Sequence, residues 1–434
     1  MSKREDQNLR QGPSPERISI LYEHYQSGKF SDAEKLAVDI TQEYPEHPFS
    51  WKVLGLLFKQ QGRVDESVAA MQRSISLSPQ DAEARNNLGA TLQESGRFEE
   101  AETSFTEAVA LKPDYALAHY NLGNTLKELG RLEEAVVRHM QAIELKPDYA
   151  EAYSNLGLAL QELGRCDEAE ASYRHAISLK PDFFQAHNNL GSTLKNLGRL
   201  DEAEASYNQA IALSPDYAEA YSNLGVTLKE LGRLDEAEES HNKAIGLKPD
   251  YAQGHCNLGV TLQEGGRLEE AEASHRKAIA LQPDQAEAHL NLSFILLKSD
   301  RLKEGLDEHE WRWDVAEHKS SNRRFPQPLW DGQKSLHDKR ILLWSEQGIG
   351  DTLNWASCLP LVASLAGHTI LECQEKVVSL LERSFPDIEV RPQDRRRDSK
   401  REDFDFHLPM GSLYRHFIQH IGKSDVDAYL IPNP

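Results

Sequence analysis

Apolar and small residues recur with a fixed period over the first three quarters of the chain. In six successive units a Leu-Gly pair is followed by a second leucine, which gives the i, i+4 spacing of a helix with one apolar face. A second glycine ends this helix, and a Glu-Ala pair begins another apolar stripe. The pattern therefore predicts pairs of amphipathic helices joined by tight turns.

A proline closes eight successive units at intervals of 34 residues, and its fixed φ and missing N–H end the second helix of the pair. These prolines are Pro45, Pro79, Pro113, Pro147, Pro181, Pro215, Pro249 and Pro283. With the first glycine at position 8, nine units occupy residues 14–47, 48–81, 82–115, 116–149, 150–183, 184–217, 218–251, 252–285 and 286–319. The first and last units are atypical, as expected where one side of a repeat meets solvent or another domain.

The 34-residue period and the recurring Asn-Leu-Gly, Gly-Arg, Glu-Ala and Ala-Ile resemble the tetratricopeptide-repeat (TPR) family. They are most similar to the superhelix of the O-linked N-acetylglucosamine transferases. One unit cannot bury its own apolar stripe, so neighbouring units must stack. We expect an all-α TPR superhelix, an α-solenoid, with an extended concave groove that binds polypeptide.

Position 6 is asparagine in seven consecutive units. These residues are Asn87, Asn121, Asn155, Asn189, Asn223, Asn257 and Asn291. At 100° per residue, position 6 points roughly 150° away from the packing positions, toward the groove. An amide can pair with the main chain of an extended peptide, and the resemblance implies that the ladder holds acceptor polypeptide. Alternatively, the asparagines only satisfy a neighbouring turn, or were copied with the repeat.

The chain has 17 histidines, and several of them fall at fixed repeat positions. Position 4 holds His119, His187, His255 and His289, and position 24 holds His139, His241 and His275. These positions take packed aromatic rings in this family, so we favour ring packing over metal binding. The four cysteines, Cys166, Cys256, Cys358 and Cys373, show neither zinc-ligand nor disulfide spacing. We expect no metal and no cofactor.

The period is lost after Trp311 and Trp313, which we expect to cap the last helix and to dock the next domain. Residues 320–337 are a predicted linker and 338–434 a small α/β Rossmann-like domain. Its predicted elements are a strand at 340–344, a Gly loop, a helix through 365, a strand at 369–373, a helix at 377–385 and a strand at 388–390. Ligands of such sheets bind at the carboxyl ends of the strands, where Gly348, Gly350 and Asp351 fall.

The loop from Ser345 to Asp351 is neither a Walker motif nor a dinucleotide fingerprint, since Leu353 stands in place of the third glycine. With its flanking tryptophans it looks like bacterial TPR proteins whose C-terminal region is similar to heptosyltransferase-type glycosyltransferases. That resemblance implies that Asp351 acts as general base on an acceptor hydroxyl. Alternatively, Asp351 caps a helix that starts at Thr352. Residues 338–434 correspond only to the N-terminal half of that two-domain fold, so we expect no complete nucleotide-sugar site unless a second half is supplied.

The net charge of −21 lies entirely in residues 1–318, which hold 33 Lys and Arg against 54 Asp and Glu. Such a surface repels phosphate backbones, so we expect no nucleic-acid partner and favour basic or neutral peptides. The polar run from Asp394 to Asp403 is interpreted as a solvated loop, with phosphate binding as the alternative. Residues 1–13 are a polar tail, and no segment is apolar enough for a leader or a membrane span. We expect a soluble, cytoplasmic protein without membrane contact.

Two functions follow from these features. The first is a TPR scaffold that binds extended polypeptide in an asparagine-lined groove and carries an incomplete glycosyltransferase-like domain. The second is an active protein O-glycosyltransferase with a nucleotide-sugar donor, in which the groove presents the acceptor. The sequence leaves open whether the chain is an enzyme.

Overall fold

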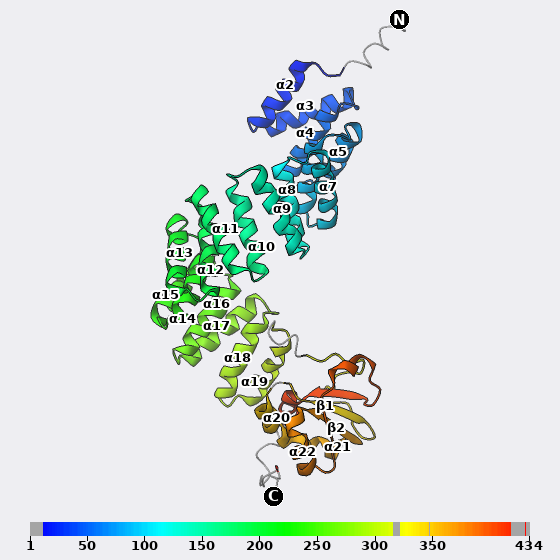
Figure 1. Cartoon of the computed structure of the whole chain (residues 1–434), viewed down its shortest axis with the longest axis vertical. Coiled ribbons are helices and arrows are strands. Elements are labelled where there is room, and N and C mark those ends of the chain that lie inside the picture. The colour runs from blue at the N-terminus through cyan, green and yellow to red at the C-terminus, as the bar shows by residue number, and fades with distance from the viewer. Residues whose placement is uncertain (1–11, 316–321, 347, 418–429, 431–434) are drawn as a thin grey trace. The chain divides into compact units, whose positions relative to one another are not determined.

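The computed structural model describes residues 12–315, 322–346, 348–417 and 430. The chain divides into two compact units, Met1–Thr227 and Leu228–Pro434. Both units contain successive helix pairs, and the second unit also contains a parallel β-sheet (Figure 1). The predicted tail lies outside the described residues except for residues 12 and 13.

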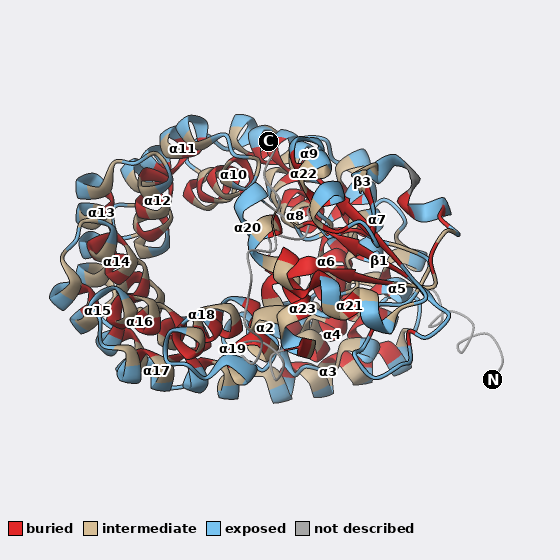
Figure 2. Cartoon of the chain, turned by 90° about the horizontal axis from the view of Figure 1, so that it is seen from below, coloured by how far each residue is buried: buried red, intermediate tan, exposed pale blue. Residues whose placement is uncertain are grey.

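The helices of the first unit follow the predicted repeats. They are α2 (Pro15–Gln26), α3 (Phe30–Glu43), α4 (Pro48–Gln60), α5 (Val64–Leu77), α6 (Ala82–Glu94), α7 (Phe98–Leu111), α8 (Ala116–Glu128), α9 (Leu132–Leu145), α10 (Ala150–Glu162), α11 (Cys166–Leu179), α12 (Phe184–Asn196), α13 (Leu200–Leu213) and α14 (Ala218–Glu230), which continues into the second unit. Within this unit α8, α10 and α12 form an inner layer and α9, α11 and α13 an outer layer (Figure 2).

The helices of the second unit that belong to the repeats are α15 (Leu234–Leu247), α16 (Ala252–Glu264), α17 (Leu268–Leu281), α18 (Ala286–Lys298) and α19 (Leu302–His309). A 3₁₀ turn, η1 (Glu310–Trp313), follows the last of them. None of the described helices is both long and apolar enough to cross a membrane.

The turn glycines take the left-handed conformation that the sequence predicts. Gly62, Gly96 and Gly130 have φ between 73° and 76°, directly after the C-caps of α4, α6 and α8. A residue with a Cβ would be strained there by roughly 1–2 kcal/mol, whereas glycine is not. The predicted turn within each helix pair is confirmed.

The glycine at position 8 makes room for the side chain at position 24 of the same unit. A Cβ on Gly89 would lie 2.8 Å from the ring of Phe105, and one on Gly157 would lie 2.8 Å from Tyr173. Both rings are completely buried. The two helices of a unit therefore approach closely at position 8, and the group that requires glycine there is the ring at position 24.

Three histidines take the place of this ring. His139, His241 and His275 are completely buried, and within the described residues neither ring nitrogen of any of them has a hydrogen-bond partner. Burial lowers the pKa of each imidazole to about 4, with a further contribution from Lys127 for His139. The predicted packing role of these histidines is confirmed, and they are neutral in the folded chain at physiological pH.

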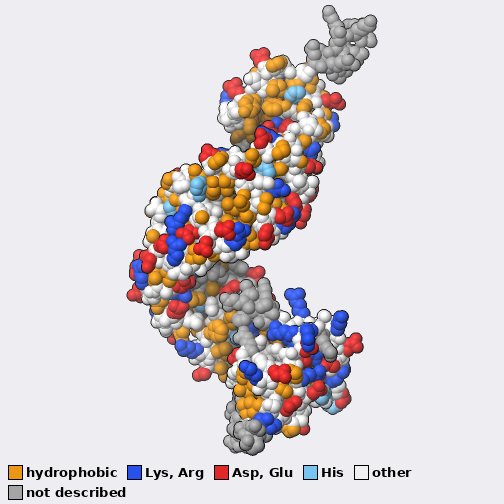
Figure 3. Space-filling model, viewed as in Figure 1, with side chains coloured by type: hydrophobic (Ala, Val, Ile, Leu, Met, Phe, Trp, Pro, Cys, Tyr) orange, Lys and Arg blue, Asp and Glu red, His pale blue; other side chains and the backbone are white. Residues whose placement is uncertain are grey.

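Ion pairs join successive repeats on the surface of the helices. Arg131, for example, contacts Glu134 of its own helix and Glu102 of the preceding unit, at 2.6 and 2.7 Å. Figure 3 shows acidic and basic side chains interspersed over the visible face of the helices. Because these pairs are exposed and screened by solvent, they contribute little to stability, and burial of the apolar stripes stabilises the stack.

Four parallel strands form the sheet of the second unit, in the order β3-β2-β1-β4. They are β1 (Arg340–Trp344), β2 (His368–Cys373), β3 (Glu389–Pro392) and β4 (Phe406–Pro409). The connecting helices are α20 (Ile349–Trp355), η2 (Ala356–Cys358), α21 (Leu359–Leu365), α22 (Glu375–Ser384), η3 (Arg395–Lys400), η4 (Met410–Ser412) and α23 (Leu413–Phe417). The predicted α/β alternation is confirmed, whereas β4 and the helix after it were not predicted.

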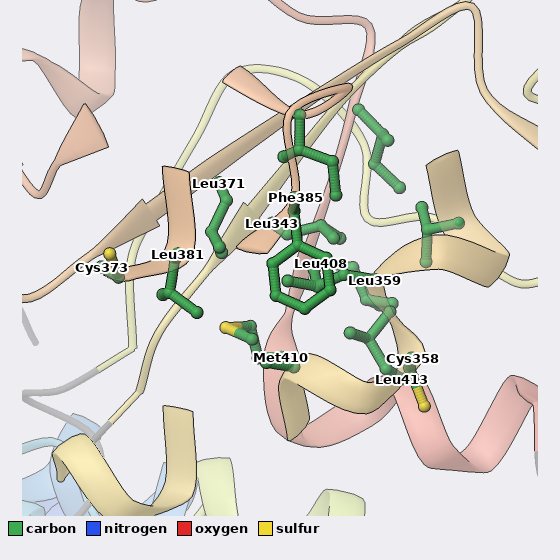
Figure 4. Packing of buried hydrophobic residues seen from close by; sticks show 14 of the residues in the cluster. Leu343, Cys358, Leu359, Leu371, Cys373, Leu381, Phe385, Leu408, Met410 and Leu413 are labelled. Atoms are coloured by element: carbon green, nitrogen blue, oxygen red, sulfur yellow. The ribbon is translucent and has the colours of Figure 1, made fainter. Parts of the chain in front are cut away.

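The core of this domain lies between one face of the sheet and the helices. Leu343, Leu371 and Leu408 of three strands pack against Leu381 and Phe385 (Figure 4). Strands that are buried in this way consist almost entirely of apolar residues, which is why β1 and β2 could be predicted from the sequence.

The opposite face of the sheet packs against the segment that follows the last repeat. Trp313 and Phe325 cover Trp344, with ring centroids 5.4 and 6.4 Å away. Trp311 stacks instead on His289 of α18, with ring centroids 4.1 Å apart and ring planes nearly parallel. The two tryptophans thus cap the last helix pair and dock the α/β domain, as predicted.

The interpretation of 394–403 as a solvated loop holds only in part, since five of its described side chains, among them Arg395 and Lys400, are exposed. Residues Arg395–Lys400 form η3, and Asp398 and Arg401 are buried. Glu372 of β2 is the reason, since this carboxylate points into the domain and is 2% exposed. Arg401 binds it, and Arg323 contacts it at 2.8 Å while also donating to Asp398 at 2.9 Å. A buried charge requires such partners.

Residues of the predicted linker lie along the outer edge of β4. Leu329 forms a parallel bridge with His407, and the Trp330 amide donates to the His407 carbonyl at 2.9 Å. Trp330 itself is buried in the main core. The segment around these residues is therefore packed on the sheet and covers one of its edges.

Candidate functional site

Five of the seven predicted asparagines lie in the first unit. Asn87, Asn121, Asn155, Asn189 and Asn223 belong to α6, α8, α10, α12 and α14, and all five side chains are half-buried. We call this set the asparagine face. Successive helices of this layer contact one another directly, as α8 does α10 and α10 does α12, so amides at the same position follow one another from repeat to repeat.

Three members of the asparagine face hydrogen-bond to the preceding repeat through their amide nitrogens. Asn121 donates to the Asn86 side-chain oxygen at 3.0 Å. Asn223 donates to the equivalent oxygen of Asn188, also at 3.0 Å, and Asn155 donates to the Tyr120 hydroxyl at 3.1 Å. Position 6 therefore links to position 5 of the unit before it. The asparagine therefore contacts the preceding repeat, and this differs from the alternative in which it satisfies only a neighbouring turn.

The same bonds orient the amide oxygens. Asn121, Asn155 and Asn223 use only the amide nitrogen, and their side-chain oxygens accept no hydrogen bond from a described residue. Asn189 differs, because its oxygen accepts from Asn188 at 3.3 Å. A half-buried oxygen in a fixed position can accept an N–H from a bound peptide.

Asn257 and Asn291 belong to the second unit, on α16 and α18. The Asn257 oxygen accepts from Gln253 at 2.9 Å, and the Asn291 amide approaches the Cys256 sulfur at 4.0 Å. Burial raises the pKa of the Cys256 thiol to about 11, so it is protonated. Cys256 is at position 5 of its unit, so Asn291 repeats the link from position 6 to position 5 of the preceding unit, with a sulfur as the acceptor.

A cavity of about 250 Å³ lies in the second unit at the carboxyl ends of β1 and β4. The lining residues are Leu290, Phe294, His309, Arg312, Ser345, Glu346, Asp351, Thr352, Trp355, Met410 and Gly411. From β1 the chain continues to β2 and β3 on one side of β1, and it then crosses to β4 on the other side of β1. Ligands of parallel sheets bind at such a switch point.

One wall of this cavity is a buried ionic cluster centred on Arg312. Its guanidinium donates to both oxygens of Glu346, at 2.9 and 3.0 Å, and to Glu310 at 2.9 Å. Ser412 accepts a further bond from it at 3.0 Å, and the Gly411 amide donates to Glu346 at 2.7 Å. Burial opposes the charge of Arg312, but the two carboxylates outweigh it and raise the pKa above its ordinary value. The cluster connects η1 to the loops after β1 and β4.

Asp351 lies at the mouth of the cavity and is exposed. The expected helix start at Thr352 is wrong, because α20 begins at Ile349 with Gly348 as its N-cap in an extended conformation. Asp351 is therefore in the first turn, where one carboxylate oxygen accepts the Gly348 N–H at 3.3 Å. Gly350 lies in the same turn and is exposed. The predicted capping role holds, from inside the helix, and the role as a base stays a prediction.

The groups around the cavity suit a small polar ligand with an apolar side. Trp355, Phe294 and Leu290 offer apolar surface, and Asp351 offers an exposed carboxylate. The charge of Arg312 is already neutralised, so the cavity has no strong attraction for phosphate. Among the described residues no group of three His, Cys, Asp or Glu side chains is arranged to hold a metal ion.

Arg312, Glu346 and Ser412 were not predicted as members of this site. Glu346 stands directly after a predicted strand, which was a usable signal. Arg312 lies between two tryptophans, and a guanidinium stacks on aromatic faces, as Arg312 does over Trp313. Ser412 follows β4, which was not predicted, so nothing pointed to it.

Comparisons with known proteins agree with the helical part of the structure. Family models described as TPR repeat match residues 55–96, 92–130, 123–164 and 160–198, and models described as tetratricopeptide repeat match 182–250 and 252–285. The protein FlbA of Caulobacter vibrioides (strain ATCC 19089 / CIP 103742 / CB 15) is 34% identical over 89 residues, which are 20% of this chain. The match spans 15% of the length of FlbA.

Several solved structures are similar to parts of the chain. The APC/C hetero-tetramer Cut9-Hcn1 has 18% identity and a TM-score of 0.49, with 62% of this chain and 52% of that chain covered. YrrB, described as a TPR protein with an unusual peptide-binding site, has 27% identity and a TM-score of 0.36 over 46% and 98% of the two chains. MamA has 25% identity and a TM-score of 0.36 over 38% and 97%. The repeat matches alone span more than half of the sequence, and the chain belongs to the tetratricopeptide-repeat family.

Proposed function

We propose that the chain is a scaffold whose first unit binds extended polypeptide along the asparagine face. The observation that carries this proposal is the fixed, half-buried amide at the same place in successive repeats. A peptide in extended conformation presents backbone N–H and C=O groups at regular intervals, which amide side chains can pair with. Recognition of the main chain allows clients of differing sequence to bind.

Charge supports the same proposal. The acidic excess of residues 1–318 raises the local concentration of basic or neutral segments and disfavours acidic ones. We therefore expect affinity to fall with added salt for basic peptides and to change little for neutral ones.

Replacing Asn155, Asn189 and Asn223 together by alanine should weaken peptide binding by at least about tenfold, since each lost hydrogen bond contributes about 0.5–1.5 kcal/mol. The measurement is fluorescence anisotropy with a panel of labelled, unstructured peptides of unrelated sequence. Two of these asparagines also bond to the preceding repeat, so a modest loss of thermal stability is expected while helicity at the assay temperature is retained.

A matched control is the replacement of Asn208 and Asn242 by alanine. Both are exposed asparagines on the second helices of their units, α13 and α15, away from position 6. This variant should bind the panel as the parent chain does. Equal affinity of the parent chain and the triple variant would contradict the proposal.

A second candidate function is a protein O-glycosyltransferase with Asp351 as general base. The switch-point cavity and the strand order support it, because β3-β2-β1-β4 matches one half of a doubly wound, Rossmann-like sheet. The volume counts against a complete site in the described residues, since about 250 Å³ is below the roughly 300–1,000 Å³ of ordinary small-molecule pockets. The cavity has room for one sugar ring or a hydroxyl side chain.

The two candidates differ in their response to nucleotide sugars. We expect calorimetric titration of the full chain with UDP-sugars and ADP-sugars to show no saturable binding. Saturable binding, together with transfer to a peptide that is lost in the Asp351→Asn variant, would establish the enzyme instead. Asparagine keeps an oxygen for the Gly348 N–H, so this variant should fold normally.

A further inference from the structure

Helix α9 of the first unit carries large apolar side chains on its exposed face. Val137 is 51% exposed and Met140 is 56% exposed. With Tyr153 and Leu156 of α10 they line a groove of about 520 Å³. We call this the α9 groove, and its lining residues are Val137, Met140, Gln141, Ile143, Glu144, Tyr153 and Leu156. Its residues are not those of the asparagine face.

The second, third and fifth to eighth repeats have no large apolar residue at either of the two positions. The residues that correspond to Val137 and Met140 are Ala69 and Gln72, Thr103 and Thr106, Ala171 and Arg174, Ala205 and Asn208, Glu239 and Asn242, and Ala273 and Arg276. A groove in the same place between α11, α12 and α13 measures about 370 Å³, and Arg174, Ser178 and Gln209 line it together with Ile177 and Leu190. Repeat geometry therefore creates the groove, and within this set only α9 adds two large exposed apolar side chains, Val137 and Met140, to it. An exposed apolar patch of this kind marks an interaction site.

Carboxylates flank the two apolar residues on the same face of α9. Glu133 precedes Val137 by one turn and Glu144 follows Met140 by one turn, so the four lie in a stripe at i, i+4, i+7 and i+11. Both glutamates are exposed. Within the described residues Glu144 makes no ion pair, and the stripe is about 16 Å long.

We propose that the α9 groove docks an amphipathic helix of a partner protein, with an apolar middle and lysine or arginine at both ends. A helix that lays apolar side chains into a groove is a common form of recognition, and the flanking carboxylates fix the charge of its ends. Charge also excludes a second copy of α9 as the occupant. An antiparallel pair would place Glu133 against Glu144, and a parallel pair would place each glutamate against itself.

This site would add selectivity that the asparagine face lacks. Main-chain pairing accepts many sequences, whereas the α9 groove requires apolar residues at helical spacing and cationic ends. One partner could thus be held by the groove while an unrelated extended segment occupies the asparagine face. The inference stands independently of the asparagine face, because it rests on different residues.

The test uses the full chain and a labelled synthetic helix of about 14 residues, with leucines at i, i+3 and i+7 and lysines at both ends. We expect saturable binding that weakens at least about tenfold in the Val137→Ala/Met140→Arg variant. These are the residues that α11 carries at the same positions, so the variant should fold, which thermal melting checks. A second variant, Glu133→Gln/Glu144→Gln, should remove most of the salt dependence of binding.

The control variant places the same residues on α7, as Thr103→Ala/Thr106→Arg, and should bind the helix normally. A companion peptide with glutamates at both ends should bind more weakly at low salt. Unchanged affinity in the Val137→Ala/Met140→Arg variant, or equal affinity for both peptides, would overturn the proposal. Concentration-dependent dimerisation of the parent chain that this variant abolishes would also overturn it, in favour of a second copy.

Discussion

Acidification from pH 7 to pH 5 should destabilise the helical repeats steeply, and three buried histidines should cause most of the loss. The pKa of His139, His241 and His275 is about 4 in the folded chain, against 6.5 for a free imidazole. Below pH 6.5 the unfolded chain binds protons that the folded chain does not accept until about pH 4. The stability that depends on these histidines being neutral is therefore complete above pH 6.5, and it decreases as the pH falls from 6.5 to about 4.

The size of the effect follows from the number of groups. Each histidine contributes a slope of about 1.4 kcal/mol per pH unit inside the window, so the three together approach about 4 kcal/mol per unit. Repeat arrays unfold in more than one step, so the midpoint of each transition in circular dichroism should be followed at pH 7.5, 6.0 and 5.0.

The chain supplies its own control for this result. Phe105 occupies position 24 in the third repeat, so the variant His139→Phe/His241→Phe/His275→Phe places a residue that the fold already uses. It should flatten the pH dependence between 7 and 5 and raise stability at neutral pH, since no unpaired ring nitrogen remains buried. A Gln variant of the exposed His337 should behave as the parent chain. Equal losses in the parent chain and the triple variant would refute the mechanism.

The helical repeats were predictable because every unit repeats the same local rules. A glycine with positive φ, a proline after the second helix and an i, i+4 apolar stripe each have one conformational consequence, and the structure shows each of them. What the pattern could not give is the pairing between positions. The ring of Phe105 over Gly89, and the link from Asn121 to Asn86, depend on how two helices stack, which one helix's periodicity does not specify.

The α/β domain was predictable only in its apolar strands. β1 and β2 are buried runs, whereas β4 contains His407 and Pro409 and follows a charged segment. That segment looked solvated because sequence shows charge but not burial. Arg401 and Asp398 are buried because Glu372, some 30 residues earlier, requires cations around it. Long-range ion pairing of this kind leaves no local periodicity, so it was found only in the structure.

Replacing Arg312 by methionine should destabilise the α/β domain by about 3–5 kcal/mol and loosen it from the last helix pair. The change leaves Glu346 and Glu310 largely buried without a cation, and an uncompensated charge costs far more than the pair contributes. Five of the six tryptophans lie between residues 311 and 355, so a urea titration followed by tryptophan fluorescence reports on this region. Helical circular dichroism should change much less, because the repeats keep their own cores.

Two further variants separate the ionic contribution from packing. Arg415→Ala removes an exposed pair with Asp307 that also joins α23 to α19, and it should cost less than about 1 kcal/mol. In Arg312→Met/Glu346→Gln the unpaired charge at Glu346 is gone as well, so this double variant should be more stable than Arg312→Met alone. If both variants at position 312 lose the same stability, side-chain packing and not charge compensation holds η1 against the loops after β1 and β4. The cavity that contains Asp351 would then owe its shape to apolar contacts.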